Sequence, residues 1–473
     1  MAYRYGDRQQ LGLFPSSIDD YVPPDAPVRA YDAFVEALNF RELGLALDEN
    51  KVGNPEYDPK AMLKLLLYGY SYGVRSSRKL EREVHYNMSF IWLMGGLRPD
   101  HKTIAEYRRA NKPMLRKTLK QCVRLCLKLN LIEGHTLFID GTKIRANASI
   151  KNSWTEDKCR RALEHMDRRI EEILEECERI DEEEDKQPSL VKMGEELGNQ
   201  DVLKAKVQEI LATLKTTEAK SVNTTDGECT RINSVHGSHA GYNAQMVVDE
   251  KNGLIVSSDV VSENNDLYQF AVQVGNAEEV LGKTCQTACA DSGYATTGEL
   301  EKVDERGVKV VVPSQRQAGD RERNPFDKTH FRYDREGDLY ICPEGKRLIF
   351  YAKQQKQRLY RIQDKAECLK CPHYGTCTKS KQGRQVTRMP NEEARDRLER
   401  QYQESSSRAI YKLRKERVEL PFGHMKRNLG VQAFLLRGLE GARAEMGLLT
   451  CCFNIRRMMS LRGVPRLVKD MAG

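Results

Sequence analysis

The sequence has no long apolar run: no segment approaches the about 18 consecutive apolar residues that a membrane-spanning helix needs. Its first ten residues, MAYRYGDRQQ, also lack the apolar core of a signal peptide. These two absences argue against a membrane-bound or secreted protein. We therefore expect a cytoplasmic protein with no membrane partner.

The chain also lacks the compact, even set of cysteines that marks a small secreted domain. It has 13 cysteines, an odd number spread over a long chain, which argues against a disulfide framework. Most of them, including Cys122, Cys126 and Cys159, fall in helical patterns and are expected to be ordinary buried residues. Four cysteines in the C-terminal third are spaced differently.

Neither sign of charge dominates the composition. The 77 Lys and Arg residues exceed the 69 Asp and Glu residues by only eight, so the net charge favours a nucleic-acid partner only weakly. Hydrophobic residues make up 39% and charged residues 31%, as in a globular protein with a highly charged surface. The length of 473 residues predicts two or three domains.

Residues 1–130 are predicted to form a mainly helical domain. Asp58-Pro59 is a favourable helix start, and Thr103–Glu106 fits a capping box that opens a basic helix around Tyr107, Arg108 and Arg109. Such a domain could contact DNA, or it could serve dimerisation and packing with a solvated charged face. No clear helix-turn-helix is present, so no recognition helix is assigned.

From residue 136 the pattern changes to strands. The segment TLFIDGTKIRANAS is predicted to form a strand that ends in a turn after Asp140, or a hairpin. Residues 241–262 predict a hairpin around Lys251-Asn252-Gly253, and further strands precede Asp291 and cover VKVVVPS. This part of the chain therefore predicts a mixed sheet.

A helical insertion is predicted at about 155–218. Apolar residues recur there at intervals of three and four among many Glu and Arg: Leu163, Met166, Ile170, Ile173, Cys177 and Ile180. The pattern resumes with Leu203, Val207, Ile210 and Leu214 after a polar loop containing Pro188 and Gly198. We expect an antiparallel helical hairpin whose charges form a solvated face.

Three acidic residues form the main candidate site. Asp140 and Asp291 each lie where an apolar strand meets a small, flexible turn. A charge in such a place is unusual unless it is paired or binds metal, although Asp-Gly and Asp-Ser-Gly are also common in turns. The third, Glu419, lies in a basic helical segment in which it shares a face with Phe422 and Lys426. Because of Pro421, Glu419 is expected in the first turn of its helix.

Together these acids predict phosphoryl chemistry. Two Mg²⁺ (or Mn²⁺) ions about 4 Å apart can clamp a scissile phosphate, and few protein carboxylates are needed to hold them. Asp140 would bridge the ions, while Asp291 and Glu419 would each hold one. The neighbouring Arg417, Lys426 and Arg427 would bind DNA phosphates. An exposed helix of mixed charge is the alternative for this third segment.

In their order along the chain, these motifs resemble the DDE transposases of bacterial insertion sequences. The resemblance covers roughly residues 20–460. PDAPVRAYDAFVEAL, YGYSYGVRSSRKLERE and GLRPDHKTIAEYR look like the N-terminal helical domain of that family. FIDGTKIRANAS, ADSGYA and VELPFGHMKR carry the three acids, and FLLRGLEGARAEMGLLTCCFNIRRM resembles the closing helices.

The resemblance implies an α/β fold: a ribonuclease H-like mixed sheet flanked by helices, with an α-helical N-terminal domain, a helical-hairpin insertion and a small cysteine-rich insertion. The expected segments are an N-terminal DNA-binding or dimerisation domain (1–130), the first part of the catalytic core (131–328), the cysteine-rich insertion (329–390) and the C-terminal part of the core (391–473).

The resemblance also implies Mg²⁺-dependent cleavage at the element ends and strand transfer by the freed 3′-hydroxyl. The partners would be the terminal inverted repeats and target DNA, bound by a homodimer or larger assembly in the bacterial cytoplasm, at the nucleoid. Tyr411 and Arg414 lie one residue further upstream of Glu419 than the family pattern places them, and Glu416 remains a rival third acid. The alternative functions are an inactive transposase-derived DNA-binding protein and a metal-dependent nuclease without strand transfer.

The four closely spaced cysteines, Cys342, Cys368, Cys371 and Cys377, match a tetrahedral structural Zn²⁺ site, and the resemblance includes them. Unliganded thiols on a surface insertion are the alternative, and His373 could replace one cysteine. Basic residues around them predict contact with the DNA backbone, or a solvated surface: Lys346, Arg347, Lys353, Lys356, Arg358 and Arg361.

Two smaller features precede the second acid. His236 and His239 form an HxxH sequence that we interpret as part of a loop. Asp266 follows the predicted hairpin; it could cap a helix or act as an accessory acid, and the cap is favoured.

Overall fold

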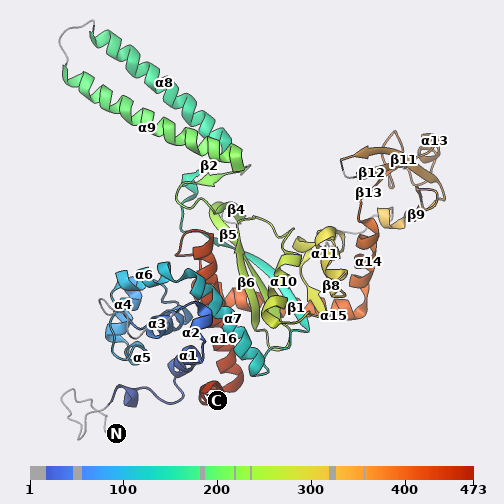
Figure 1. The fold of residues 1–473 in the computed structure, drawn as a ribbon. Helices are drawn as coiled ribbons and strands as arrows, with labels where there is room; N and C mark the ends of the chain where they lie inside the picture. Colours follow the sequence, from blue (N-terminus) through green and yellow to red (C-terminus); the bar gives the residue numbers. More distant parts are fainter. Residues whose placement is uncertain are drawn as a thin grey trace, which may run out of the picture. The chain divides into compact units, whose positions relative to one another are not determined.

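The computed structural model describes residues 17–45, 56–181, 187–217, 220–234, 237–318, 326–355 and 357–472 (Figure 1). The fold is mixed α/β, as expected, and no helix in this part of the chain is long and apolar enough to span a membrane. The chain forms two compact units. The first comprises Met1–Asp266, Val272–Cys285 and Arg414–Gly473, and the second comprises Leu267–Ala271 and Gln286–Leu413.

The first unit begins with helices, as predicted for the N-terminal segment. After a short 3₁₀ turn at Ile18–Tyr21 come α1 (Pro27–Glu36), α2 (Phe40–Leu43), α3 (Pro59–Ser71), α4 (Ser77–Tyr86), α5 (Met88–Leu93), α6 (His101–Ala110) and α7 (Lys112–Lys128). The Asp58 carboxylate accepts hydrogen bonds from the N–H groups of Lys60 (2.9 Å) and Ala61 (3.3 Å), which confirms the predicted start of α3.

The predicted start of α6 is wrong. The helix begins at His101, three residues before the start that a Thr103 cap implies, because the Asp100 carboxylate accepts a hydrogen bond from the Thr103 N–H at 2.7 Å and caps it. The Glu106 side chain instead pairs with Arg109. A stronger upstream cap therefore replaces the capping box that the sequence contains.

The sheet of the first unit contains β1 (Thr136–Arg145), β4 (Thr230–Ser234), β5 (Gly237–Asp249) and β6 (Ile255–Val261). The long strand β5 pairs antiparallel with β1 along one edge and with β4 and β6 along the other. The turn between β5 and β6 includes Gly253 at φ +67°, a conformation that favours glycine. The hairpin predicted around Asn252-Gly253 is confirmed.

Helices close this unit. α10 (Phe270–Leu281) follows β6 in the chain, and α16 (Leu439–Arg462) and α17 (Val464–Ala472) end it. α16 is almost fully buried and packs against α3, α7 and β6 (Figure 1). The Asn454 side chain fixes α16 to the sheet edge, because it accepts from the Ile255 N–H and donates to the Ile255 carbonyl, both at 2.8 Å.

The predicted helical hairpin consists of α8 (Glu156–Asp181) and α9 (Gln187–Thr217), which lie side by side (Figure 1). Its base is closed by two short paired strands, β2 (Ser153–Trp154) and β3 (Val222–Asn223), next to a 3₁₀ turn at Ile150–Asn152. The apolar seam buries Cys159, Met166, Val207 and Leu214. Cys177 and Ile180 lie outside the residues whose side chains are described.

Two details of the hairpin differ from the expectation. Pro188 and Gly198, predicted in a loop, lie inside α9. Pro188 is tolerated because the first turn of a helix needs no N–H donor, and an interior glycine costs only about 1 kcal/mol. Leu203 is 44% exposed and so does not belong to the seam.

The second unit contains two groups of strands. The first is a parallel pair, β7 (Thr287–Cys289) and β8 (Lys309–Val311), with a 3₁₀ turn (Ser292–Tyr294) and α11 (Thr297–Asp304) between them. The other is an antiparallel sheet in the order β13–β12–β11–β10–β9, made of β9 (Arg332–Asp334), β10 (Leu339–Ile341), β11 (Arg347–Gln354), β12 (Gln357–Ile362) and β13 (Gln385–Arg388).

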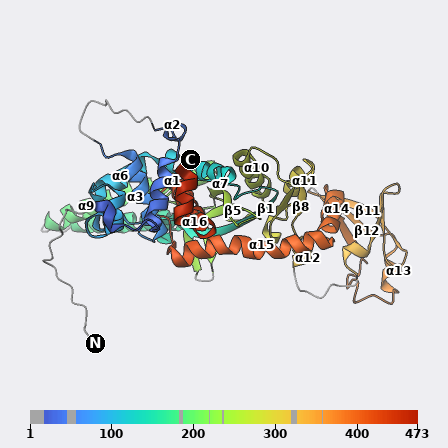
Figure 2. The same cartoon turned by 90° about the horizontal axis from the view of Figure 1, so that it is seen from below.

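The helices of the second unit are shorter. They are α12 (Gln315–Ala318), a 3₁₀ turn at Lys328–His330, α13 (Lys365–Leu369) and α14 (Glu392–Gln403). The next helix, α15 (Ser405–Gly423), starts in the second unit and ends in the first, and a π-helical segment, His424–Asn428, follows it (Figure 2).

Candidate active site and DNA-binding surfaces

Asp140 lies in the middle of β1 rather than at its end. The strand continues because its pairing with β5 extends past Asp140 and Gly141 to Arg145, which pairs with Gly241. The expected turn after Asp140 is therefore wrong, although the three apolar residues before it are fully buried as expected. Its carboxylate is 18% exposed; Oδ1 accepts from the Gly141 N–H at 2.9 Å and Oδ2 lies 3.4 Å from Nη1 of Arg414.

Glu419 is exposed and lies near the C-terminal end of α15, not in its first turn. Pro421 sits inside the helix, and the chain then widens into the π segment, where the Leu429 N–H bonds to the His424 carbonyl at 3.1 Å. The regular spacing expected for Glu419, Phe422 and Lys426 thus ends at Gly423. Pro421 therefore does not start this helix, and it lies three residues before the change from α-helix to π-helix.

The same segment returns to β1 through Lys426, whose Nζ donates a hydrogen bond to Oγ1 of Thr142. Burial lowers the pKa of the Lys426 amine, and the Asp140 carboxylate opposes that change. Of the other predicted phosphate-binding residues, Arg427 is exposed and Arg417 passes close to Gly253 in the β5–β6 turn. Two cations therefore contact the strand that carries Asp140: Arg414 from α15 and Lys426 from the π segment.

Asp291 belongs to the second unit, whereas Asp140 and Glu419 belong to the first. Its Oδ1 accepts a hydrogen bond from the Gly293 N–H at 2.8 Å, so Asp291 caps the 3₁₀ turn at Ser292–Tyr294. The turn chemistry in ADSGY is therefore present. Within the described ranges, no three or more His, Cys, Asp or Glu side chains gather closely enough to hold a metal ion.

Asp266 is not a helix cap, since α10 begins only at Phe270. Its Oδ1 accepts hydrogen bonds from the amides of Asn243 and Gln245, each at 2.7 Å, and lies 3.5 Å from Nζ of Lys143. Asn243 and Gln245 are fully buried on β5, so they need a polar partner. Polar residues alternating within the apolar strand GYNAQMVV were the signal for this network.

The two histidines have different outcomes. His236 lies outside the described residues. His239 is part of β5, where it pairs with Ile232 and its Nε2 lies 3.2 Å from a guanidinium nitrogen of Arg145, so the loop interpretation is wrong for it.

The basic helix α6 does not present its cations freely. Arg108 is buried and donates to the Tyr70 hydroxyl (3.2 Å) and the Arg75 carbonyl (2.8 Å), while Arg109 pairs with Glu106. Tyr107 donates to the Pro59 carbonyl at 2.8 Å. Tyr107 and Arg108 thus tie α6 to the rest of the helical bundle, whereas the Arg109–Glu106 pair is exposed and lies within α6.

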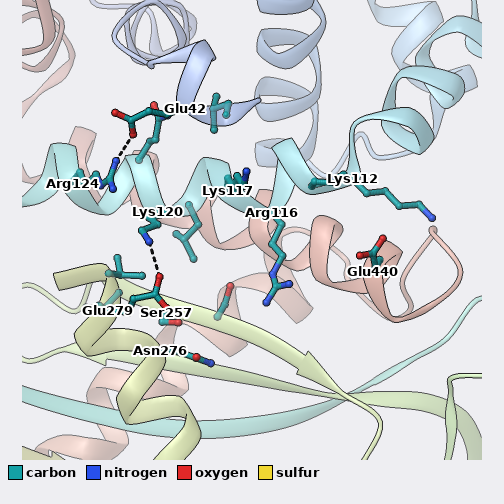
Figure 3. A pocket seen from close by; sticks show the side chains of 17 residues that line it. Glu42, Lys112, Arg116, Lys117, Lys120, Arg124, Ser257, Asn276, Glu279 and Glu440 are labelled. Atoms are coloured by element: carbon teal, nitrogen blue, oxygen red, sulfur yellow. Dashed lines mark hydrogen bonds and ion pairs between the residues drawn. The ribbon is translucent and has the colours of Figure 1, made fainter. Parts of the chain in front are cut away.

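The neighbouring helix α7 has a more accessible basic stripe. It lines a cavity of about 530 Å³ with five cations: Lys112, Arg116, Lys117, Lys120 and Arg124. Figure 3 shows Lys120 directed at Glu279 (2.8 Å) and Arg124 at Glu42. Arg116 lies 3.7 Å from Asp259. In the described part of the chain no ion pair joins Lys112 or Lys117 to an acid, so these two carry charge available to phosphate.

The four cysteines of the second unit line one cavity, although, like the three acids, they are not close enough together in the described residues to form a metal-ion site. Cys342, Cys368, Cys371 and Cys377 line one cavity of about 40 Å³ beside the core of the five-stranded sheet. Backbone N–H groups of Lys346 and Arg384 donate to the sulfurs of Cys342 (3.3 Å) and Cys368 (3.4 Å). Burial raises the pKa of the Cys368 and Cys377 thiols, and the neighbouring cysteines raise it further. His373 also lines the cavity, and its Nε2 lies 3.2 Å from Glu344.

Two family descriptions match this chain. "Transposase DDE domain" matches residues 341–459, which contain Glu419 and the four cysteines, and "Transposase domain (DUF772)" matches residues 16–110, which contain α1 to α6. Both descriptions are of transposase domains. More specifically, they are typical of the DDE transposases of insertion sequences, and they confirm the resemblance seen in the sequence.

One solved structure can be aligned with most of this chain. A piggyBac transposase synaptic complex with hairpin DNA aligns with 94% of this chain and 79% of that chain, at 10% identity and a TM-score of 0.32. No curated protein matches the chain.

Proposed function

We propose that this protein binds insertion-sequence ends, cleaves DNA with divalent metal ions held by Asp140, Asp291 and Glu419, and joins the freed 3′-hydroxyl ends to target DNA. The observation that carries the proposal is the position of residues 414–426 against β1. Arg414 lies 3.4 Å from Asp140, and Lys426 donates to Thr142. The segment with the proposed third acid thus lies beside the strand with the first.

The proposed fold of the catalytic core is ribonuclease H-like. An antiparallel set of β1, β5 and β6, then α10, then the parallel pair β7 and β8 supports this interpretation. The core would comprise residues 131–328 and 391–473, interrupted by the hairpin at about 155–218 and the cysteine-rich insertion at 329–390. Residues 1–130 would bind DNA or mediate dimerisation.

The donor chemistry of the three acids fits Mg²⁺ or Mn²⁺, since hard cations prefer carboxylate oxygens and complete their shell with water and phosphate. Asp140 supports the fit because it is a largely buried carboxylate held on a rigid strand. When bound, such ions would activate the attacking hydroxyl and stabilise the leaving oxygen.

The chain's own cations would position the DNA. Arg414 offers a planar guanidinium that can bind two phosphate oxygens at once, and Lys426 adds a point charge held in place by Thr142. Both would draw a phosphate toward Asp140. Arg417 and Arg427 would bind phosphates further along the backbone.

The four cysteines are proposed to hold a structural Zn²⁺ ion. Four half-buried thiols line one cavity, and backbone N–H groups already donate to two of the sulfurs, as in sites where such bonds orient the ligands. The partners would be the two element ends and a target DNA. Because two ends must be joined to one target, a homodimer or larger assembly in the bacterial cytoplasm, at the nucleoid, is expected.

The test uses a DNA fragment that carries the ends flanking the gene, incubated with the full chain in Mg²⁺ and, in parallel, in EDTA. Mg²⁺-dependent nicks at the element boundary should disappear in Asp140→Asn, Asp291→Asn and Glu419→Gln while end binding is retained. Glu416→Gln is the matched control, because Glu416 is an exposed acid on the same helix. Loss of cleavage in Glu416→Gln but not in Glu419→Gln would reassign the third acid.

A second assay with pre-cleaved ends separates the possible activities. Joined products establish strand transfer. Cleavage without joining would leave a nuclease, and end binding without cleavage in Mg²⁺ or Mn²⁺ would leave a DNA-binding protein derived from a transposase.

A further inference from the structure

The five-stranded sheet of the second unit has two different faces. One face forms a core from Phe331, Tyr340, Leu348, Tyr360, Ile362 and Val386. On the opposite face, register places five residues in one row across all five strands: Asp334, Leu339, Ile349, Arg361 and Gln385. Ile349 in this row is 42% exposed. We call this second face the outer face.

Tyr351 is directed to the outer face by a bulge in β11. The register shifts between Phe350 and Ala352, which leaves Tyr351 as the extra residue. The Arg361 guanidinium lies over its ring, 3.6 Å from the ring centroid. Because Arg361 belongs to the outer row, this contact fixes Tyr351 on the same face. The ring is still 56% exposed, so a large aromatic surface meets solvent next to an aliphatic side chain.

The sequence around this surface has an excess of positive charge. Residues 332–362, from β9 to β12, contain eight Lys and Arg and four acids: Asp334, Glu336, Asp338 and Glu344. Arg347 pairs with Ile341 and so shares the outer face. Arg358 does not add to its charge, because its guanidinium lies over the ring of Tyr360 in the core and pairs with Asp338. A face with this charge is complementary to a polyanion rather than to an apolar partner surface.

We propose that the outer face binds single-stranded DNA, with an unpaired base stacked on Tyr351 beside Ile349 and the backbone phosphates bound by Arg347 and Arg361. Exposed aromatic rings among cations are how proteins bind single strands, because every base has a stacking face. A duplex keeps these faces inside its own stack. That the single strand is DNA rests on the proposed function, because a transposase must unpair or cut DNA near the element ends.

The test measures fluorescence anisotropy of a labelled thymidine oligonucleotide of about 12 nucleotides, with the full chain and no added Mg²⁺ or Mn²⁺, so that no cleavage occurs and the zinc proposed beside the sheet is not removed. Tyr351→Ala should weaken binding about 10-fold, whereas Tyr351→Phe, which keeps the ring, should bind like the wild type. Ile349→Ala should give a smaller loss in the same direction. Tyr268→Ala is the matched control, because Tyr268 is 64% exposed in the same unit but outside the sheet.

Thermal unfolding of each variant shows that the sheet is intact, and a duplex of equal length gives the specificity. Equal binding of single strands by Tyr351→Ala and wild type overturns the proposal. An equal loss for duplex and single strand also overturns it and makes the face a phosphate-binding surface. A change in sedimentation with no change in single-strand binding would make it a contact between copies of the chain. Asp140→Asn should bind the oligonucleotide normally, so failure of cleavage and failure of this proposal remain distinguishable.

Discussion

Nη1 of Arg414 lies 3.4 Å from Oδ2 of Asp140, and this ion pair joins α15 to β1 across nearly three hundred residues of sequence. Both side chains are largely buried, with 14% and 18% exposed, so the pair is screened less than a surface salt bridge. Arg414 lies one residue further from Glu419 than the family pattern places it, yet its guanidinium lies beside the proposed first acid. Tyr411 instead stacks edge-on against Tyr402 at 5.4 Å.

Arg414→Gln should slow end cleavage about 10- to 100-fold, because a hydrogen bond to a charged group contributes about 1.5–3 kcal/mol. Arg414→Lys should recover only part of the rate, since an ammonium cannot bind two oxygens in one plane. Single-turnover cleavage with bound ends measures the effect. The control is Arg408→Gln, an exposed arginine on the same helix. Normal cleavage by both Arg414 variants would remove Arg414 from the site.

Lys112→Ala and Lys117→Ala should each weaken DNA binding and flatten its salt dependence. Both lysines line the α7 cavity without an ion pair to an acid in the described residues, so each can release a counterion from DNA. The slope of log K against log salt should fall by about 0.9 for each lysine that contacts a phosphate. Lys128→Ala, an exposed lysine at the end of the same helix and outside the cavity, should leave the slope unchanged.

The purified chain should contain about one zinc ion per molecule, and Cys371→Ser should lose most of it. Without the metal, the small core of the five-stranded sheet loses its cross-link, so protease cleavage within residues 340–380 should increase. Atomic absorption and limited proteolysis measure the two effects. Cys159→Ala, which changes a buried cysteine of the helical hairpin, should keep the zinc. A wild-type protein without zinc would exclude the site.

Glu445 should make stability depend on pH. Burial raises the pKa of its carboxyl group, against the opposing effects of Arg75 (2.9 Å away) and the N–H groups of Leu435 and Leu436. The folded state therefore keeps this proton to higher pH than the unfolded state. As pH rises from the ordinary carboxyl pKa of about 4.5 through the raised value, this group costs stability, by about 1.4 kcal/mol for each pH unit that separates the unfolded-state pKa from the folded-state pKa.

Glu445→Gln removes this titration and keeps the size of the side chain. The variant should therefore gain stability relative to the wild type as pH rises above about 4.5, which urea unfolding at several pH values can measure. The opposite trend would mean that Arg75 and the backbone N–H groups outweigh burial.

Local sequence signals predicted many of the elements. Asp58-Pro59 gave the start of α3 because a side-chain cap acts within three residues, and Asn252-Gly253 gave the β5–β6 turn because its backbone needs a glycine. The seam of the hairpin followed from its spacing alone. Each of these features depends only on residues that are close together in the sequence.

The wrong predictions concern residues whose position depends on segments that are distant in the sequence. Asp140 lies inside a strand because β5 pairs past it, and Glu419 lies late in its helix because the chain passes through Pro421 without stopping. Asp266 serves two buried amides on β5 rather than a helix end. Arg75 and Glu445 are paired across 370 residues. A single sequence contains no local signal for such pairs.

The short ladder at the base of the helical hairpin has a consequence for how this chain can vary. Ser153 pairs with Asn223 and Trp154 with Val222, so the chain leaves and re-enters the base of the insertion at adjacent points. The entropic cost of closing a loop rises slowly with its length, by about 0.6 kcal/mol for each doubling of the number of residues. The segment beyond these four residues can therefore lengthen, shorten or be exchanged for an unrelated domain while β1 and β5 keep their register. Among related chains, this is where length should diverge most and where a fused reporter should be tolerated.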